Sequence, residues 1–152
     1  MNEEKPFSIK LEKHQTRDIN DKHVNGSLTV VWRDYDSIIK NQPKMVYVSS
    51  VDPDEVKGPH LHTKRNSYFV CIHGKVAFII KDQDGNYIEI ESSEDIPNLV
   101  FVPKNFPAAH INLSKEPSII LALVSPSWKP DNRDEHNVTY DDYDWNKWNV
   151  SK

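Results

Sequence analysis

Two histidines separated by one residue, His60 and His62, are the residues of this chain best placed to do chemistry. In an extended strand alternate side chains share a face, so both imidazoles point to one side and Leu61 to the other. Paired imidazoles can bind a metal ion, or accept and donate protons near neutral pH. An ordinary strand with two surface histidines is the alternative that the pair alone leaves open.

The neighbours of this pair extend the candidate site. The same alternation predicts that Lys64, Asn66 and Tyr68 share the histidine face unless a bulge intervenes. A third histidine, His110, follows the proline-led stretch 102–107. The alternative for His110 is a structural histidine inside the barrel, with its hydrogen bonds satisfied and no role in the site.

Short strands are the elements that must position these residues. Ten prolines break up long helices, and the apolar residues come in runs of strand length rich in Val, Ile, Phe and Tyr. Only Asp34–Asn41 is a candidate for a short helix. We expect strands over Phe7–Leu11, Ser27–Arg33, Met45–Val51, Ser67–Ile72, Lys75–Lys81, Tyr87–Glu91, Leu99–Val102, Ala108–Asn112 and Ser118–Ser125.

Turn signals join these strands into an all-β fold. His73-Gly74 predicts one tight turn, and Asp82–Asn86 predicts a hairpin in which Gly85 adopts a positive φ. Many short strands with turn signals about every 8–12 residues are typical of a sandwich or barrel. Such folds must cover or close their sheet edges, which favours a jelly roll or a dimer.

Composition narrows the class of protein. The 152 residues suit one domain, which we expect to span 1–152 with a barrel over about 7–125. The lone cysteine, Cys71, forms no intrachain disulfide, and the N-terminus lacks an apolar signal segment, so we expect a cytoplasmic protein. A net charge of −4 disfavours nucleic-acid binding, and no apolar run is long enough to span a membrane.

The last stretch, 126–150, differs from the rest. It is too aromatic for a disordered tail, so we expect an arm that packs back across the barrel or onto a partner subunit. Its aromatic residues are Trp128, Tyr140, Tyr143, Trp145 and Trp148.

Together these features resemble the two motifs of the cupin superfamily: an HxH strand with a glycine turn, then a proline-led turn with a third histidine. The resemblance implies an antiparallel jelly-roll barrel whose mouth holds the site. Metal-binding cupins carry a glutamate shortly after the histidine pair, where this chain has Asn66 and Ser67. In the second motif, Asn105 replaces the usual glycine.

Three neutral imidazoles, from His60, His62 and His110, could still hold Zn²⁺ or Fe²⁺ with open positions. No acidic ligand would then help to offset the charge of the dication. We therefore expect neither a metal nor any other cofactor, with a three-histidine metal enzyme as an alternative.

A narrower resemblance covers most of the chain. Asn25–Leu28 resembles the start of sugar-nucleotide cupins, and Met45–Val48 followed by Lys57–His62 resembles the dTDP-4-keto-6-deoxyglucose 3,4-ketoisomerases. The pattern from Trp128 through Glu135 to Trp148 is similar to the C-terminus of the dTDP-4-dehydrorhamnose 3,5-epimerases. The resemblance implies a metal-free homodimer of bacterial carbohydrate biosynthesis that transfers protons on a nucleotide-linked 4-keto sugar.

The same resemblance assigns roles. His60 corresponds to the histidine that both families use as a base, and His62 to the second histidine of the ketoisomerases. A proton beside a carbonyl is acidic enough for a histidine base if the enolate is stabilised. The epimerases carry a tyrosine acid on a late strand, which here reads Ile119–Val124 without a tyrosine. Tyr47 and Tyr68 remain candidates for the acid or for sugar contacts.

A nucleotide diphosphate also needs cations. Lys57 stands where both families have arginine, and a lysine lacks the guanidinium fork that grips a phosphate. Other candidate cations are Lys64, Arg65, Arg33 and Lys81. The residues expected to bind substrate are Tyr47, Lys57, Lys64, Asn66, Tyr68 and His110. A cupin that binds such a ligand without turnover is the second alternative.

Overall fold

The computed structural model describes residues 4–40 and 42–150, which form strands and one short 3-10 helix. The strands are β1 (Phe7–Lys10), β2 (Lys13–Arg17), β3 (Val24–Thr29), β4 (Met45–Val51), β5 (Val56–His62), β6 (Asn66–His73), β7 (Lys75–Lys81), β8 (Tyr87–Ser93), β9 (Asn98–Val102), β10 (Ala108–Asn112), β11 (Ser118–Ser125) and β12 (Glu135–Asn137). The 3-10 helix, η1, covers Trp145–Trp148. The expected domain, 1–152, also includes Met1–Glu3, Asn41 and Ser151–Lys152, which lie outside the described residues.

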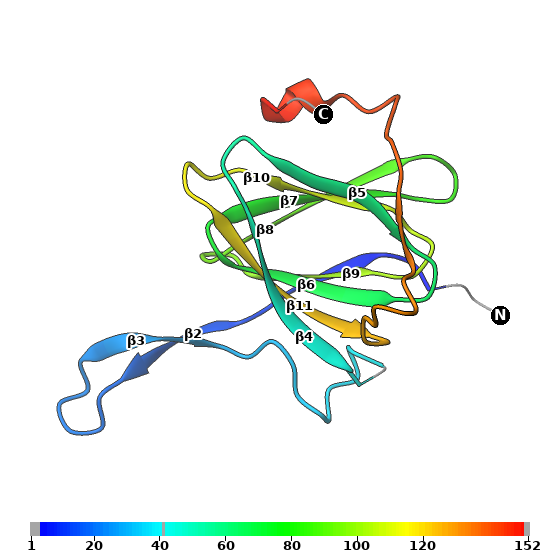
Figure 1. The fold of residues 1–152 in the computed structure, drawn as a ribbon. Helices are drawn as coiled ribbons and strands as arrows, with labels where there is room; N and C mark the ends of the chain where they lie inside the picture. Colours follow the sequence, from blue (N-terminus) through cyan, green and yellow to red (C-terminus); the bar gives the residue numbers. More distant parts are fainter. Residues whose placement is uncertain (1–3, 41, 151–152) are drawn as a thin grey trace.

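Two five-stranded antiparallel sheets face one another (Figure 1), in the orders β1-β9-β6-β11-β4 and β12-β5-β10-β7-β8. The all-β cupin-type jelly roll expected from the sequence is confirmed. None of the described helices is long and apolar enough to cross a membrane.

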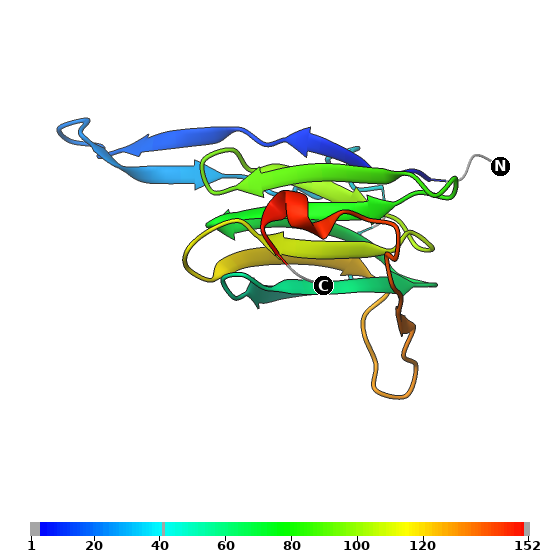
Figure 2. The same ribbon diagram turned by 90° about the horizontal axis from the view of Figure 1, so that it is seen from above.

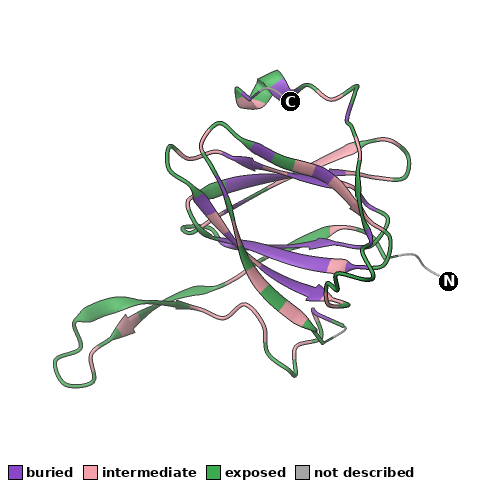
Figure 3. Ribbon diagram, in the orientation of Figure 1, coloured by how far each residue is buried: buried purple, intermediate pink, exposed green. Residues whose placement is uncertain are grey.

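Alternation along the strands separates the inside of the barrel from the outside. On β4, Met45 and Tyr47 pack against the inner core, whereas Val46 and Val48 are exposed. Buried residues such as Phe78 fill the space between the sheets, where Figure 3 shows mostly buried positions. The period of two in the sequence therefore decides which side chains can reach an internal site.

Each sheet is also covered on its outer face. Residues 31–39 place Trp32 and Ile39 against the sheet that contains β6. The C-terminal arm buries Tyr140 and Trp145 against the other sheet, and the Tyr140 hydroxyl donates to the Ile79 carbonyl over 3.1 Å. The expected packing of the arm onto the barrel is confirmed.

Some expected elements differ in the structure. The helix expected from Asp34 is wrong over residues 34–40, the part of it that the structure describes, because these residues form turns and bends. Asp36 instead accepts from the backbone of Arg33. The strand expected over Ser27–Arg33 begins at Val24 and ends at Thr29, because it pairs with β2. This β2–β3 hairpin projects away from the barrel (Figures 1 and 2).

Truncation of Trp145 should detach the arm and destabilise the fold. The indole is buried beside Tyr140, so Trp145→Ala should lower the free energy of unfolding by about 3–5 kcal/mol in urea denaturation. Trp128→Ala is the matched control, because that indole is 47% exposed and its loss should cost little. Equal losses in the two variants would contradict the packing role of the arm.

Candidate functional site

A polar cavity of about 230 Å³ lies inside the barrel, between the two sheets. Its apolar wall includes Phe69, Phe106 and Ile120. Among the other lining residues are the side chains that carry charge or protons: Tyr47, Lys57, His60, His62, Arg65, His110 and Glu135. Acid–base groups are thus gathered in an apolar surrounding, where electrostatic interactions are stronger than in water.

The strand β5 directs both histidines of the pair into this cavity, as alternation predicts. Gly58 precedes them with φ +88, and a Cβ there would stand 2.8 Å from the Ala108 carbonyl oxygen. Only glycine accepts that backbone conformation and close approach without strain. Gly58 therefore lets β5 run close beside β10, where His60 stands opposite Ala108.

The turn that begins at Pro103 holds the end of β5. Asn105 has φ +69, a conformation that asparagine tolerates better than most residues, which explains how it stands in the place of a glycine. Its backbone N–H donates to the His62 carbonyl over 2.7 Å. The second cupin-like motif thus fixes the backbone of the histidine in the first.

A carboxylate pair from β12 and the residue before it meets the histidines. Because β12 pairs with β5, Glu135 stands directly opposite His62. Its Oε1 lies 3.6 Å from His60 Nδ1 and 3.7 Å from His62 Nε2. One carboxylate oxygen therefore lies between the two imidazoles.

The preceding residue, Asp134, is buried and orients His62. Its Oδ1 lies 3.1 Å from His62 Nδ1, and its Oδ2 accepts from the backbone N–H groups of Lys64 and Arg65, each over 3.0 Å. Burial alone would raise the pKa of Asp134, but these hydrogen bonds together lower it. An ionised carboxylate needs a donor, so the proton of neutral His62 lies on Nδ1 and Nε2 is left as an acceptor.

Burial shifts the pKa values of Tyr47 and His62 in the directions that favour their neutral forms. It lowers the pKa of His62, a shift that the Arg65 charge reinforces and Asp134 opposes. It raises the pKa of Tyr47, and the Arg65 charge opposes that shift. At neutral pH the site therefore holds an unprotonated imidazole that can accept a proton and a phenol that can donate one.

His110 is the third histidine of the cavity, on β10. The rings of Phe69 and Phe78 meet it edge-on, with centroids 4.7 and 4.9 Å away. Burial, helped by the charge of Lys57, lowers its pKa to about 3. His110 is accordingly a neutral imidazole in the wall of the cavity.

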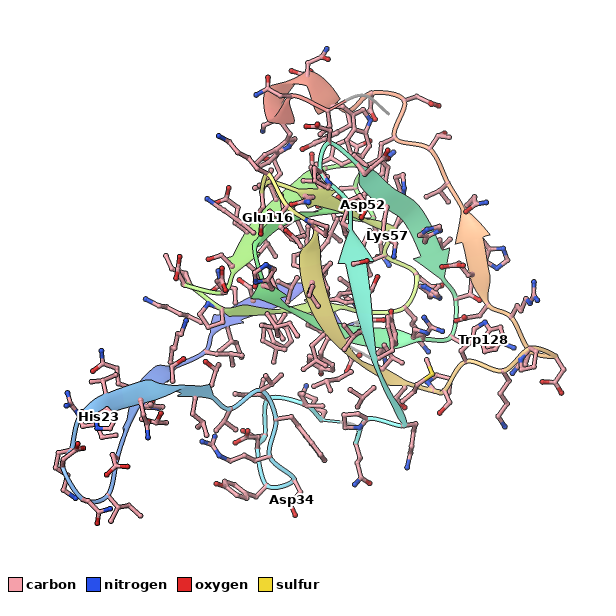
Figure 4. The ribbon with its side chains drawn as sticks, turned by 60° about the vertical axis from the view of Figure 1, so that its left-hand side comes forward. His23, Asp34, Asp52, Lys57, Glu116 and Trp128 are labelled. Carbon is pink, nitrogen blue, oxygen red and sulfur yellow. The ribbon has the colours of Figure 1, made fainter. Side chains whose placement is uncertain are left out.

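The three cavity histidines do not fit a metal site. Within residues 4–40 and 42–150, the only set of three His, Cys, Asp or Glu ligand atoms that lie within 4.8 Å of one another comes from Asp18, Asp21 and His23. That set lies on the β2–β3 hairpin, and Figure 4 shows His23 far from the barrel.

Three residues expected to bind substrate lie outside the cavity. Tyr68 is buried on the outer face of its sheet, where it stacks on Phe101 at 4.6 Å, and Asn66 accepts from the backbone of Lys104. The Lys64 ammonium donates to the Asn132 side chain at the exposed surface. The prediction that Lys64, Asn66 and Tyr68 share the histidine face is wrong, because the chain passes from one sheet to the other after His62.

This crossing reverses the phase of the alternation, so the odd-numbered residues Arg65, Ser67 and Phe69 line the cavity instead. Of the other expected cations, Lys57 lines the cavity and donates to Ser49 over 2.6 Å, between the ribbons of β5 and β4 (Figure 4). Arg33 and Lys81 lie elsewhere, near Asp36 and Asp142 respectively.

Sequence reasoning missed the carboxylates that contact the histidines. Asp134 and Glu135 are some 70 residues away from the pair in the chain, and no spacing rule connects them. The one available signal was Glu135 itself, which belongs to the epimerase-like C-terminal pattern.

Comparison with known proteins shows the family of the chain and proteins that share its fold. A family model described as "FdtA: WxcM-like, C-terminal" matches residues 9–144. The chain belongs to this FdtA family. A comparison with curated proteins finds no match.

Solved structures share the fold of this FdtA-family chain. A dTDP sugar isomerase from Desulfovibrio desulfuricans G20 is 16% identical, with a TM-score of 0.71 over 89% of this chain and 85% of its own. ChmJ, a 3'-monoepimerase from Streptomyces bikiniensis solved with dTDP-quinovose, is 16% identical, with a TM-score of 0.71 over 88% and 69%. The capsular polysaccharide assembling protein CapF from Staphylococcus aureus is 22% identical, with a TM-score of 0.60 over 64% of this chain; the match spans only 29% of CapF.

The desolvated imidazole of His110 should make folding stability depend on pH. The unfolded chain binds a proton at this imidazole below about pH 6.5, whereas the folded protein does so only near pH 3. Stability should therefore fall as the pH drops from 6.5, by up to about 1.4 kcal/mol per pH unit. His110→Gln should flatten the slope between pH 6.5 and 5 in urea denaturation. An unchanged slope in this variant would contradict the pKa assigned to His110.

Proposed function

We propose that the protein is an isomerase or epimerase of a nucleotide-linked 4-keto-6-deoxy sugar and transfers protons by histidine acid–base catalysis without a metal. The observation that supports this most is the hydrogen bond from His62 Nδ1 to the buried Asp134, which leaves Nε2 as a proton acceptor beside Glu135 and His60. Such preorganisation suits proton transfer more than passive binding.

In the proposed reaction, His60 takes the proton from the carbon next to the keto group, and the electron pair moves onto the keto oxygen. For a 3,4-ketoisomerisation, the enolate oxygen on C4 gains a proton, and the neighbouring hydroxyl then loses its proton while C4 gains one. Two protons leave and two are returned, so that the keto group moves from C4 to C3 and a hydroxyl remains on C4. His62 accepts the hydroxyl proton, and Glu135 lies where it can pass protons between His62 and His60. The neutral phenol of Tyr47 is an alternative to the histidines as the donor of a proton to the substrate. No oxidant or reductant is needed.

The comparisons support the substrate class. The structural neighbours are named as a dTDP sugar isomerase and a 3'-monoepimerase solved with dTDP-quinovose, and CapF is named for capsular polysaccharide assembly. We infer from these names a substrate of the dTDP-sugar class and a pathway of bacterial surface carbohydrate such as capsule or lipopolysaccharide.

The late strand favours ketoisomerisation over 3,5-epimerisation. On β11, Ile120 lines the cavity and Ala122 and Val124 join the inner core, so that strand offers no acid. The same observation leaves a binding cupin without turnover as the second candidate. Exchange of solvent deuterium into a dTDP-4-keto-6-deoxy sugar would distinguish an enzyme from a binding protein.

Substitution of the proposed base should abolish most of the activity. Removing a positioned acid or base typically costs a factor of about 10²–10⁴, so His60→Asn should slow deuterium incorporation by that factor. Mass spectrometry of the sugar nucleotide measures the rate, and circular dichroism checks the fold. His136→Asn is the matched control, because that exposed histidine stands opposite Leu61 rather than in the cavity.

Full exchange by the His60 variant would remove this residue from the mechanism. The same assay after treatment with EDTA tests the metal-free proposal, for which the rate should stay unchanged. Loss of exchange on chelation, restored by zinc or iron, would reassign the cavity histidines as ligands.

We further propose that the protein is a homodimer in which the β2–β3 hairpin and the edge strand β4 contact a second copy. Within the described residues, β4 has a neighbouring strand on one side only, and Val46 and Val48 are 58% and 62% exposed. Leu28 on the projecting hairpin is 52% exposed. Such an edge favours pairing with another chain.

Sedimentation at micromolar concentration should give twice the 17.7 kDa mass of the chain. Val48→Lys should shift the equilibrium towards the monomer, because it places a charge on the proposed interface. A wild-type monomer at that concentration would contradict the proposal.

A further inference from the structure

Arg65 is a buried positive charge on the wall of the cavity. The residue is only 8% exposed, and its Nε is buried without a hydrogen-bond partner among the residues that the structure describes. The nearby carboxylate of Asp134 binds His62 and the backbone N–H groups of Lys64 and Arg65, not the guanidinium. The side chain therefore brings a positive charge into the barrel without a salt bridge to any described residue.

Such an arrangement is costly for folding. A guanidinium remains protonated at any physiological pH, and a buried charge without a counter-ion is strongly destabilising. Among the described residues, no carboxylate lies within 4.0 Å of the guanidinium: Glu135, which lines the same cavity, has its Oε1 beside His60 and His62 instead. Tyr47, the hydrogen-bonding neighbour of Arg65, is uncharged because burial raises its pKa. A charged donor facing a cavity is suited to an anionic group that arrives with a ligand.

The backbone holds Arg65 in a fixed relation to the histidine pair. Asp134 binds the Arg65 N–H with Oδ2 while it binds His62 Nδ1 with Oδ1. The backbone of Arg65 and the proton acceptor are thus held by the same buried carboxylate. The guanidinium extends from this backbone to the cavity that His62 also lines.

We propose that Arg65 binds an anionic oxygen of the ligand inside the barrel, and that this is the keto oxygen of the sugar as it becomes an enolate. The inference rests on the proposed function: when His60 takes the proton from carbon, the electron pair moves onto the oxygen, which then accepts from the Arg65 N–H. Lys57 is exposed whereas Arg65 is buried, so the diphosphate is assigned to the more accessible Lys57. Preorganised donors of this kind stabilise the charge of the transition state.

The stability of the ligand-free protein is the first test. If Arg65 is present for a ligand, Arg65→Met should leave the thermal midpoint unchanged or raise it, because the variant removes a buried charge that has no counter-ion. If the guanidinium instead holds the fold together, the midpoint should fall by several degrees. That fall would overturn the proposal.

Two ligand measurements then locate the oxygen. With Arg65→Met and Arg65→Lys, the affinity for dTDP, which has no sugar, should stay within about twofold of wild type in calorimetric titration. The rate of deuterium exchange should fall by about 10²–10³. Arg33→Gln is the control that should change neither quantity, because this exposed arginine lies near Asp36, outside the cavity.

Weaker dTDP binding by tenfold or more would overturn the enolate assignment and place the diphosphate at Arg65. Unchanged affinity together with unchanged exchange would overturn the site altogether. If wild type itself catalyses no exchange, the proposed function fails, yet the thermal and dTDP measurements still test Arg65 as an anion receptor.

Discussion

The buried carboxylate of Asp134 is the interaction on which the candidate site depends. It joins the end of β5 to the segment before β12, orients His62, and satisfies two backbone N–H groups in the turn that leads into β6. A charge can be buried in this way because all of its partners are donors. Without it, the turn between the sheets would lose its hydrogen bonds and the imidazole its fixed tautomer.

The barrel makes this polar cluster possible by covering both sheets on both faces. The inner core surrounds the cavity, the residues 31–39 cover one outer face, and the C-terminal arm covers the other. Because the cavity walls exclude water from one side of each group, neutral imidazoles and phenols are favoured over charged ones. Lys57 and Arg65 are the lysine and arginine side chains that line the cavity.

Most strands of the barrel could be predicted from residue types. Four expected strands match the structure residue for residue: Met45–Val51, Lys75–Lys81, Ala108–Asn112 and Ser118–Ser125. They could be predicted because β-branched and aromatic residues are typical of half-buried or buried strands. The strands β2 and β12 were not predicted, because both are polar and mostly exposed and are ordered only by pairing. Five of the residues expected in the site do line the cavity: Tyr47, Lys57, His60, His62 and His110. Tyr68, which was also expected there, lies on the outer face of its sheet.

Local relations follow from the order of the residues alone: the shared face of His60 and His62, the turn glycines, and the family to which these motifs belong. Each of these depends on a few consecutive residues and on the two-residue period of an extended chain. The folded chain shows two further facts: the phase reverses between His62 and Arg65, and Glu135 stands opposite His62. Those facts depend on how the chain crosses between sheets and on pairing across some 70 residues, which no local pattern encodes.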